Sequence, residues 1–142
     1  MAASKDFADY CCELLDTVGV CAARRMFGGF GIAVDGLTIA IIADLGTGEK
    51  LWLKADNDTR AEYEAAQCAR FTYDVQGVPK SMNYYSAPDE AMESQAAMRP
   101  WAQLALQCAL RARADAFLKK KRPKPVTNNA RTAIKSIATL KP

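Results

Sequence analysis

Two glycine-rich segments are the first places in this sequence where chemistry would be sought. Gly46-Thr47-Gly48-Glu49-Lys50 has the residue types of a phosphate loop, in which backbone N–H groups hold phosphate oxygens. Its spacing differs from that of a P-loop, and it precedes a strand-like apolar run instead of a helix. Gly28-Gly29-Phe30-Gly31 likewise does not fit the dinucleotide-binding pattern. We therefore expect both segments to form turns or bulges, which use the backbone freedom of glycine.

Side chains for acid–base, nucleophilic or metal chemistry are sparse. The chain has no histidine, which removes the commonest general base and every Ser-His-Asp or Cys-His arrangement. Its five cysteines contain no Cys-x-x-Cys pair, and several fall in apolar patterns, which favours reduced thiols in the cytoplasm. Acidic residues cluster at predicted helix starts and on polar faces, where capping and solubility explain them. We expect no enzymatic activity, no metal and no cofactor.

Charge divides the chain into two parts. Residues 1–118 contain eleven Lys/Arg and sixteen Asp/Glu, a net charge of −5, whereas residues 119–142 contain eight Lys/Arg and no acid. We expect a folded domain over 1–118 and a basic, flexible tail over 119–142. Clustered cations bind polyanions by releasing counterions, although they also occur as solvated helix ends. The candidate nucleic-acid contacts are Lys119, Lys120, Lys121, Arg122 and Lys124.

The elements that would position these groups begin with a helix. Apolar residues recur every three to four positions from Phe7 to Val18, with Ser4 as a plausible N-cap and Gly19 as a stop. Three antiparallel strands follow at 30–34, 37–43 and 51–54. Asp35-Gly36 lies between the first two, and this pair is typical of a type I′ hairpin turn.

A second helix and two more strands are predicted next. Thr59 and Glu62 have capping-box spacing, although Asn57 or Asp58 fits the cap equally well, and the helix ends near Gln67. Strands are expected at 71–73 and 81–85. A short helical segment opens at residue 88, and Pro100 begins a last helix that is apolar on two sides. The predicted order is α-βββ-α-ββ-α.

Several segments in this order resemble the TfoX N-terminal family. The resemblance extends over about residues 10–118. It rests on Arg25-Met26-Phe27-Gly28-Gly29-Phe30-Gly31-Ile32, Val34-Asp35-Gly36, Leu51-Trp52-Leu53-Lys54, Phe71-Thr72-Tyr73, Ser81-Met82-Asn83-Tyr84-Tyr85, Pro88-Asp89-Glu90 and Arg99-Pro100-Trp101.

The resemblance implies a fold and a class of function. The fold is a two-layer α+β domain with helices against an antiparallel five-stranded sheet, similar to secretion chaperones. The family has no catalytic residues to carry over. Its full-length members look like transcriptional coactivators of natural competence that work with a cyclic-AMP receptor protein. They carry a second, C-terminal domain, and the basic tail here is too short to be that domain, so we expect a short stand-alone member.

We expect a non-enzymatic regulatory domain in the cytoplasm. Its predicted partner is a protein such as a transcription regulator, with a homodimer through the two-sided last helix as a second expectation. The candidate interaction surface is Arg25, Met26, Phe27, Gly28 and Gly29. The alternative for this segment is a bulged strand packed under the last helix. The alternative function is a nucleic-acid accessory protein that contacts phosphates through its tail. No apolar run approaches the ~20 residues of a membrane helix.

Overall fold

The first helix begins at the cap that the sequence predicts. The computed structural model describes residues 4–26, 28–46 and 48–121. In α1 (Lys5–Leu15), the Ser4 hydroxyl accepts a hydrogen bond from the Phe7 N–H at 3.2 Å. A 3₁₀ turn, η1 (Asp16–Val18), then leads to Gly19, whose φ of 148° ends the helical segment.

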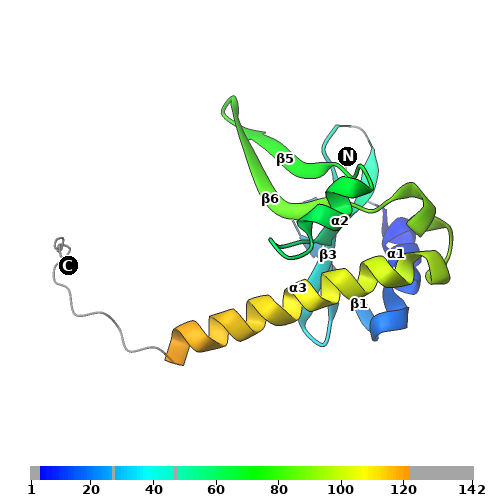
Figure 1. The fold of residues 1–142 in the computed structure, drawn as a ribbon. Coiled ribbons are helices and arrows are strands. Elements are labelled where there is room, and N and C mark those ends of the chain that lie inside the picture. The colour runs from blue at the N-terminus through cyan, green and yellow to red at the C-terminus, as the bar shows by residue number, and fades with distance from the viewer. Residues whose placement is uncertain (1–3, 27, 47, 122–142) are drawn as a thin grey trace. The chain divides into compact units, whose positions relative to one another are not determined.

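In the described residues, six strands form one antiparallel sheet in the order β1-β2-β3-β4-β6-β5. Figure 1 shows β5 and β6 as a long hairpin that extends from this sheet. They are β1 (Cys21–Met26), β2 (Gly29–Val34), β3 (Leu37–Asp44), β4 (Glu49–Lys54), β5 (Arg70–Val75) and β6 (Val78–Ser86). Asp35 and Gly36 have φ angles of 52° and 78°, which confirms the predicted type I′ turn. Gln76 and Gly77 make a turn with the same left-handed geometry between β5 and β6, with φ angles of 52° and 81°.

The prediction of five strands was wrong by one, because strand β1 was not predicted. The strand reads Cys-Ala-Ala-Arg-Arg-Met and lies at the edge of the sheet, paired only with β2. After Cys21 every residue of β1 is exposed. An edge strand without a buried face shows no alternation of apolar and polar residues, and that alternation is the main sequence signal of a strand.

Two details of the helices also differ from the predictions. The short helix α2 (Arg60–Ala65) follows Thr59, but the Thr59 side chain caps no helical N–H, so the capping box is absent. Its hydroxyl instead accepts from the Asp56 N–H at 3.1 Å. After η2 (Asp89–Glu93), helix α3 (Gln95–Lys121) begins five residues before Pro100. Ser94 supplies the cap there, since its hydroxyl accepts from the Ala97 N–H at 3.1 Å.

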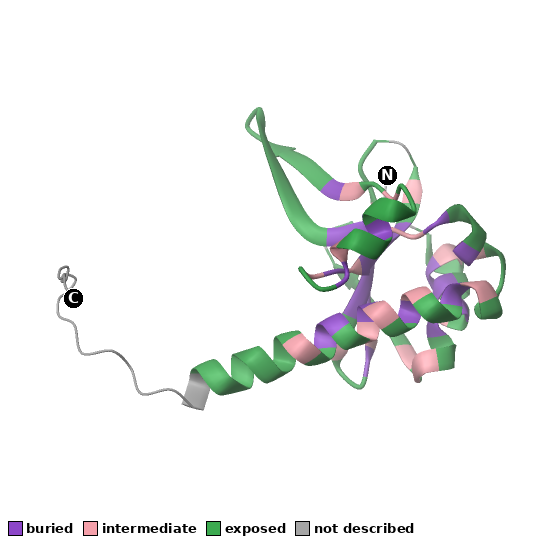
Figure 2. Cartoon of the chain, in the orientation of Figure 1, coloured by how far each residue is buried: buried purple, intermediate pink, exposed green. Residues whose placement is uncertain are grey.

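The main core lies between the helices and one face of the sheet. The described residues up to Ala112 form one compact unit, and the described residues 113–121 belong to a second unit. Within the first, buried side chains of α1, α2 and residues 98–109 of α3 form one core with buried residues of β2, β3, β4 and β6. Figure 2 shows these buried positions, and it shows the β5–β6 hairpin exposed along most of its length.

Aromatic rings fix the position of α2 in this core. The Tyr63 ring stacks on Tyr85 of β6, with ring centroids 5.3 Å apart and planes 7° apart. On α3, Trp101 lies 5.4 Å from the same Tyr63 ring. Tyr63 is fully buried, and its hydroxyl donates to the Lys54 carbonyl at 3.3 Å. The expected two-layer α+β architecture is confirmed.

Candidate functional site: an apolar hollow on the second face of the sheet

The second face of the sheet carries a smaller apolar cluster built from strands alone. Among the described residues, its buried members are Ile41, Trp52, Phe71 and Tyr84. Trp52 and Phe71 meet edge to face with ring centroids 5.0 Å apart, and the Trp52 indole N–H donates to the Ala43 carbonyl at 3.4 Å. None of the four is more than 8% exposed, so the cluster forms a firm floor.

Beside this floor lies an open hollow of about 450 Å³. Its walls come from both ends of the sheet, with Met26 at the end of β1, Ala43 on β3, and Tyr73 and Met82 on β5 and β6. Met26, Tyr73 and Met82 are each exposed by 37–39%. Among the described residues that line it, Asp44 is the only charged one. A hollow of this size and apolar character is typical of a binding site.

Two glycines let the walls approach one another. A β-carbon on Gly29 would lie 1.9 Å from the Ile42 carbonyl oxygen, so only glycine allows β2 to pair this closely with β3. A β-carbon on Gly31 would lie 2.7 Å from Sδ of Met26, so the Met26 side chain occupies the space that glycine leaves. The glycine-rich segment is thus part of the wall of the hollow, as glycines at close backbone approaches often are.

Three of the five residues of the predicted interaction surface line the hollow: Met26, Gly28 and Gly29. Arg25 pairs with Phe30, and its guanidinium lies 4.8 Å from the centre of that ring. Phe27 lies outside the described residues. The alternative of one bulged strand was wrong, because Gly28 adopts a φ of 80° and reverses the chain between β1 and β2. The irregularity in pairing lies between Ile32 and Ala33.

The contribution of the β5–β6 hairpin to this site was not predicted from the sequence. Phe71 and Tyr73 on β5 alternate with residues of the other face, as do Met82 and Tyr84 on β6. The alternation of residues between the two faces can be read from the sequence, and it identifies β5 and β6 as strands. Which strands lie near β1 and β3 depends on the order of the sheet, which the pattern does not give.

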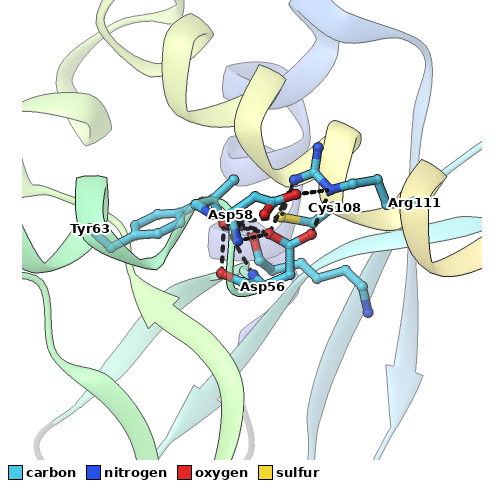
Figure 3. Close-up of polar contacts among 7 residues, drawn as sticks. Asp56, Asp58, Tyr63, Cys108 and Arg111 are labelled. Carbon is cyan, nitrogen blue, oxygen red and sulfur yellow. Dashed lines mark hydrogen bonds and ion pairs between the residues drawn. The ribbon is translucent and has the colours of Figure 1, made fainter.

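Apart from the hollow, a polar cluster joins the loop before α2 to α3 (Figure 3). The Arg111 guanidinium donates to both carboxylate oxygens of Asp56, at 2.8 and 3.1 Å, and lies 3.4 Å from Asp58. The hydrogen bonds from Arg111 hold the pKa of the Asp56 carboxyl below its ordinary value. Beneath this pair, Thr59 Oγ1 lies 3.2 Å from the buried Cys108 Sγ. These groups are engaged with one another, which indicates a structural junction.

The thiols are free and are held in their protonated form. All five cysteines are unpaired, and burial is the main cause that raises each pKa. A raised pKa lowers the thiolate fraction and hence the reactivity. In the described part of the chain, no three His, Cys, Asp or Glu side chains are grouped so that they could hold a metal ion.

The predicted nucleic-acid contacts lie at the limit of the described residues. Lys119 is exposed near the end of α3, and the backbone of Lys120 and Lys121 continues that helix. The side chains of these two lysines, and the whole of Arg122 and Lys124, lie outside the described residues. None of the described helices is both long enough and apolar enough to cross a membrane.

No curated protein matches the chain. A comparison with protein families matches residues 13–109 to the TfoX N-terminal domain. The match runs from the last turn of α1 into α3, so it includes the whole sheet and every described residue of the hollow. Because it covers more than half of the chain, the chain belongs to the TfoX N-terminal domain family.

Proposed function

We propose that this chain is a non-enzymatic interaction domain that binds a protein partner in a regulatory system of the cytoplasm. The observation that carries the proposal is the apolar hollow on the sheet face that the helices leave uncovered. Three partly exposed side chains, Met26, Tyr73 and Met82, surround it. Apolar walls of this kind lose unfavourable contact with water when a partner covers them.

Family membership supports the regulatory part of the proposal. The finer form of the proposal is a link to transcription, in which the partner is a transcription regulator and the process is natural competence. A homodimer is the other partner that we propose to test. Sedimentation velocity over a range of protein concentrations distinguishes a monomer from a dimer.

Site-specific photo-crosslinking in cells tests the hollow as an interaction surface. A benzoylphenylalanine is placed at Tyr73, which lines the hollow, and in a matched control at Gln103, which is exposed on α3. We expect discrete crosslinked species from position 73 that position 103 does not give, and mass spectrometry identifies the captured chain. Equal patterns from both positions, or none from position 73, would contradict the proposal.

DNA binding through the basic residues is a second candidate, and the charge distribution favours it. Eight Lys/Arg and no acid lie in residues 119–142, against a net −5 in the rest of the chain. The test measures fluorescence anisotropy of duplex DNA with the full chain at low and physiological salt. Substituting Lys119, Lys120 and Lys121 by Gln should weaken binding. It should also reduce the slope of log K against log salt concentration by about three, which corresponds to the loss of three phosphate contacts. Unchanged binding would remove these lysines as contacts.

A further inference from the structure

The sheet face that carries the hollow also carries four cations. Side chains of residues paired across neighbouring strands lie on the same face of a sheet. Four basic residues pair in this way with residues of the second face: Arg24 with Gly31, Lys50 with Ala43, Lys54 with Tyr84, and Lys80 with Tyr73. We call Arg24, Lys50, Lys54 and Lys80 the cationic rim. The Lys54 ammonium lies 5.4 Å from the centre of the Tyr84 ring, which places it beside the apolar floor.

No described acidic side chain forms an ion pair with the cationic rim. The strands contribute three acids. Glu49 accepts a hydrogen bond from the Ser4 N–H at 2.9 Å on the helix-covered face, and Asp74 alternates with Tyr73 and therefore points away from the hollow. Asp44, at one end of the hollow, accepts from the Gly46 and Gly48 N–H groups at 2.8 and 3.1 Å. Asp44 keeps its negative charge, but the four cations of the rim outnumber this one carboxylate, so this face is net positive although residues 1–118 are net negative.

We propose that the hollow binds an acidic peptide segment of a partner protein, with apolar side chains on the floor and carboxylates on the cationic rim. This inference rests on the proposed function and specifies the chemistry of its partner. Met26 and Met82 at the walls are unbranched and partly exposed, so they adapt to apolar side chains of different shape. The rim then steers and orients the acidic segment, which is the usual effect of complementary charge at an interface.

The same charges disfavour the other occupants of the hollow. The basic residues 119–142 of the chain itself would bring cations to the rim. A second copy docked face to face would place one rim against another. Single-stranded nucleic acid needs several open ring faces for the stacking of successive bases, but Trp52, Phe71 and Tyr84 are at most 8% exposed. Among the described aromatic residues of the hollow, Tyr73 alone is partly exposed.

Peptide binding to the full-length chain tests this inference. The probe is a rhodamine-labelled peptide of about twelve residues, with two leucines and one phenylalanine among glutamates and aspartates. The matched probes carry Gln and Asn, or Lys, in place of the acids, and an oligothymidylate represents single-stranded nucleic acid. We expect the acidic peptide to bind at least about tenfold more tightly than the neutral one, with an affinity that falls as salt rises.

Variants locate the binding on the chain. The double change Lys50→Glu and Lys80→Glu reverses two exposed rim charges and should weaken the acidic peptide by at least about tenfold. Tyr73→Ser with Met82→Ser should weaken the acidic and the neutral peptide alike, because it removes apolar wall. Arg99→Glu on the exposed side of α3 is the control and should leave binding unchanged. The variant Lys119, Lys120 and Lys121→Gln separately tests whether the acidic peptide contacts the basic residues instead of the rim. Circular dichroism confirms that each variant is folded.

Three results would overturn the inference. Equal affinity for the acidic and neutral peptides would show a hollow indifferent to charge, and loss of binding in the Lys119–Lys121 variant alone would place the contact elsewhere. Rim-dependent binding of oligothymidylate without binding of the acidic peptide would identify a nucleic-acid surface. In each case, partner-specific crosslinking from position 73 would leave the proposed interaction function standing, whereas absence of crosslinking together with absence of peptide binding would remove both.

Discussion

The Met26 side chain lies in the space that a side chain of Gly31 would fill. A β-carbon on Gly31 would be 2.7 Å from Sδ of Met26, and the thioether is the flexible end of an unbranched side chain. The contact joins edge strand β1 to β2 on the face that carries the hollow. The shape of this wall of the hollow therefore depends on both residues, since the Met26 side chain lies there only because Gly31 has no side chain.

Whether Gly31→Ala lowers or raises the free energy of unfolding should depend on the residue at position 26. In the wild-type background the new methyl group displaces the thioether, and we expect a loss of about 1 kcal/mol in the free energy of unfolding. In a Met26→Ala background the three atoms nearest to the new β-carbon are gone, and alanine should stabilise the strand by about 0.5 kcal/mol relative to glycine. Urea unfolding of the four chains measures this coupling. The same sign in both backgrounds would contradict it.

Gly29→Ala should be far more damaging than Gly31→Ala. The new β-carbon would meet the Ile42 carbonyl oxygen at 1.9 Å, and this oxygen belongs to the backbone of β3 and cannot rotate away. We expect a loss of about 3 kcal/mol or more, because β2 must move away from β3. Thermal unfolding of the two glycine variants side by side gives the comparison. Equal losses would show that β2 has room to shift.

The elements with local signals were predictable from the sequence. Ser4 predicted the start of α1, and the Asp35-Gly36 pair predicted a type I′ hairpin turn. Both predictions succeeded because a cap and a tight turn depend only on residues that are neighbours in the chain. Strand β1 lacked such a signal, since it is an exposed edge strand. The start of α3 was misplaced because Pro100 is a common first residue of helices, whereas here Ser94 caps the helix earlier.

The candidate site was predictable only in part, because it depends on contacts between distant segments. Met26 and Gly29 came from a recognisable glycine-rich segment, but Tyr73 and Met82 join them only through the order of strands in the sheet. The pairing of Asp56 with Arg111 spans 55 positions of the chain, and charges of both signs are too common for a pattern to select this pair.

Removing the Arg111 side chain should loosen the junction between α3 and the loop before α2. Arg111 holds both carboxylate oxygens of Asp56 but is 38% exposed, so we expect Arg111→Ala to lose only about 1 kcal/mol in urea unfolding. Arg111→Lys should have a stability between those of the wild type and Arg111→Ala, because lysine keeps the positive charge but cannot donate to both carboxylate oxygens in the planar geometry of a guanidinium. Arg99→Ala, at an exposed position of the same helix, serves as the control and should change little.

The advantage of the wild type over Arg111→Ala should depend on pH. The pKa of Asp56 lies below its ordinary value of 3.8 chiefly because Arg111 donates hydrogen bonds to it. A lowered pKa in the folded state gives stability that is present above the ordinary pKa and is lost as pH falls through the folded value. The difference between the two chains should therefore be full at pH 7 and shrink below about pH 4. A difference that stays constant down to pH 2 would show that Asp56 does not carry it.

The raised pKa values of one buried and one partly buried thiol should make the fold sensitive to alkali. Burial raises the pKa of Cys11 and of Cys21 to about 12, from an ordinary value of 9.0. Between these values the folded chain keeps protons that the unfolded chain has lost, so stability is full below pH 9 and falls as pH rises, by up to about 1.4 kcal/mol per pH unit for each thiol. Urea midpoints between pH 8 and pH 10.5 measure the slope. Cys11→Ala removes one of these thiols without adding a polar atom, so the urea midpoint of this variant should fall less steeply with pH. An unchanged dependence on pH would show that other groups cause the loss of stability in alkali.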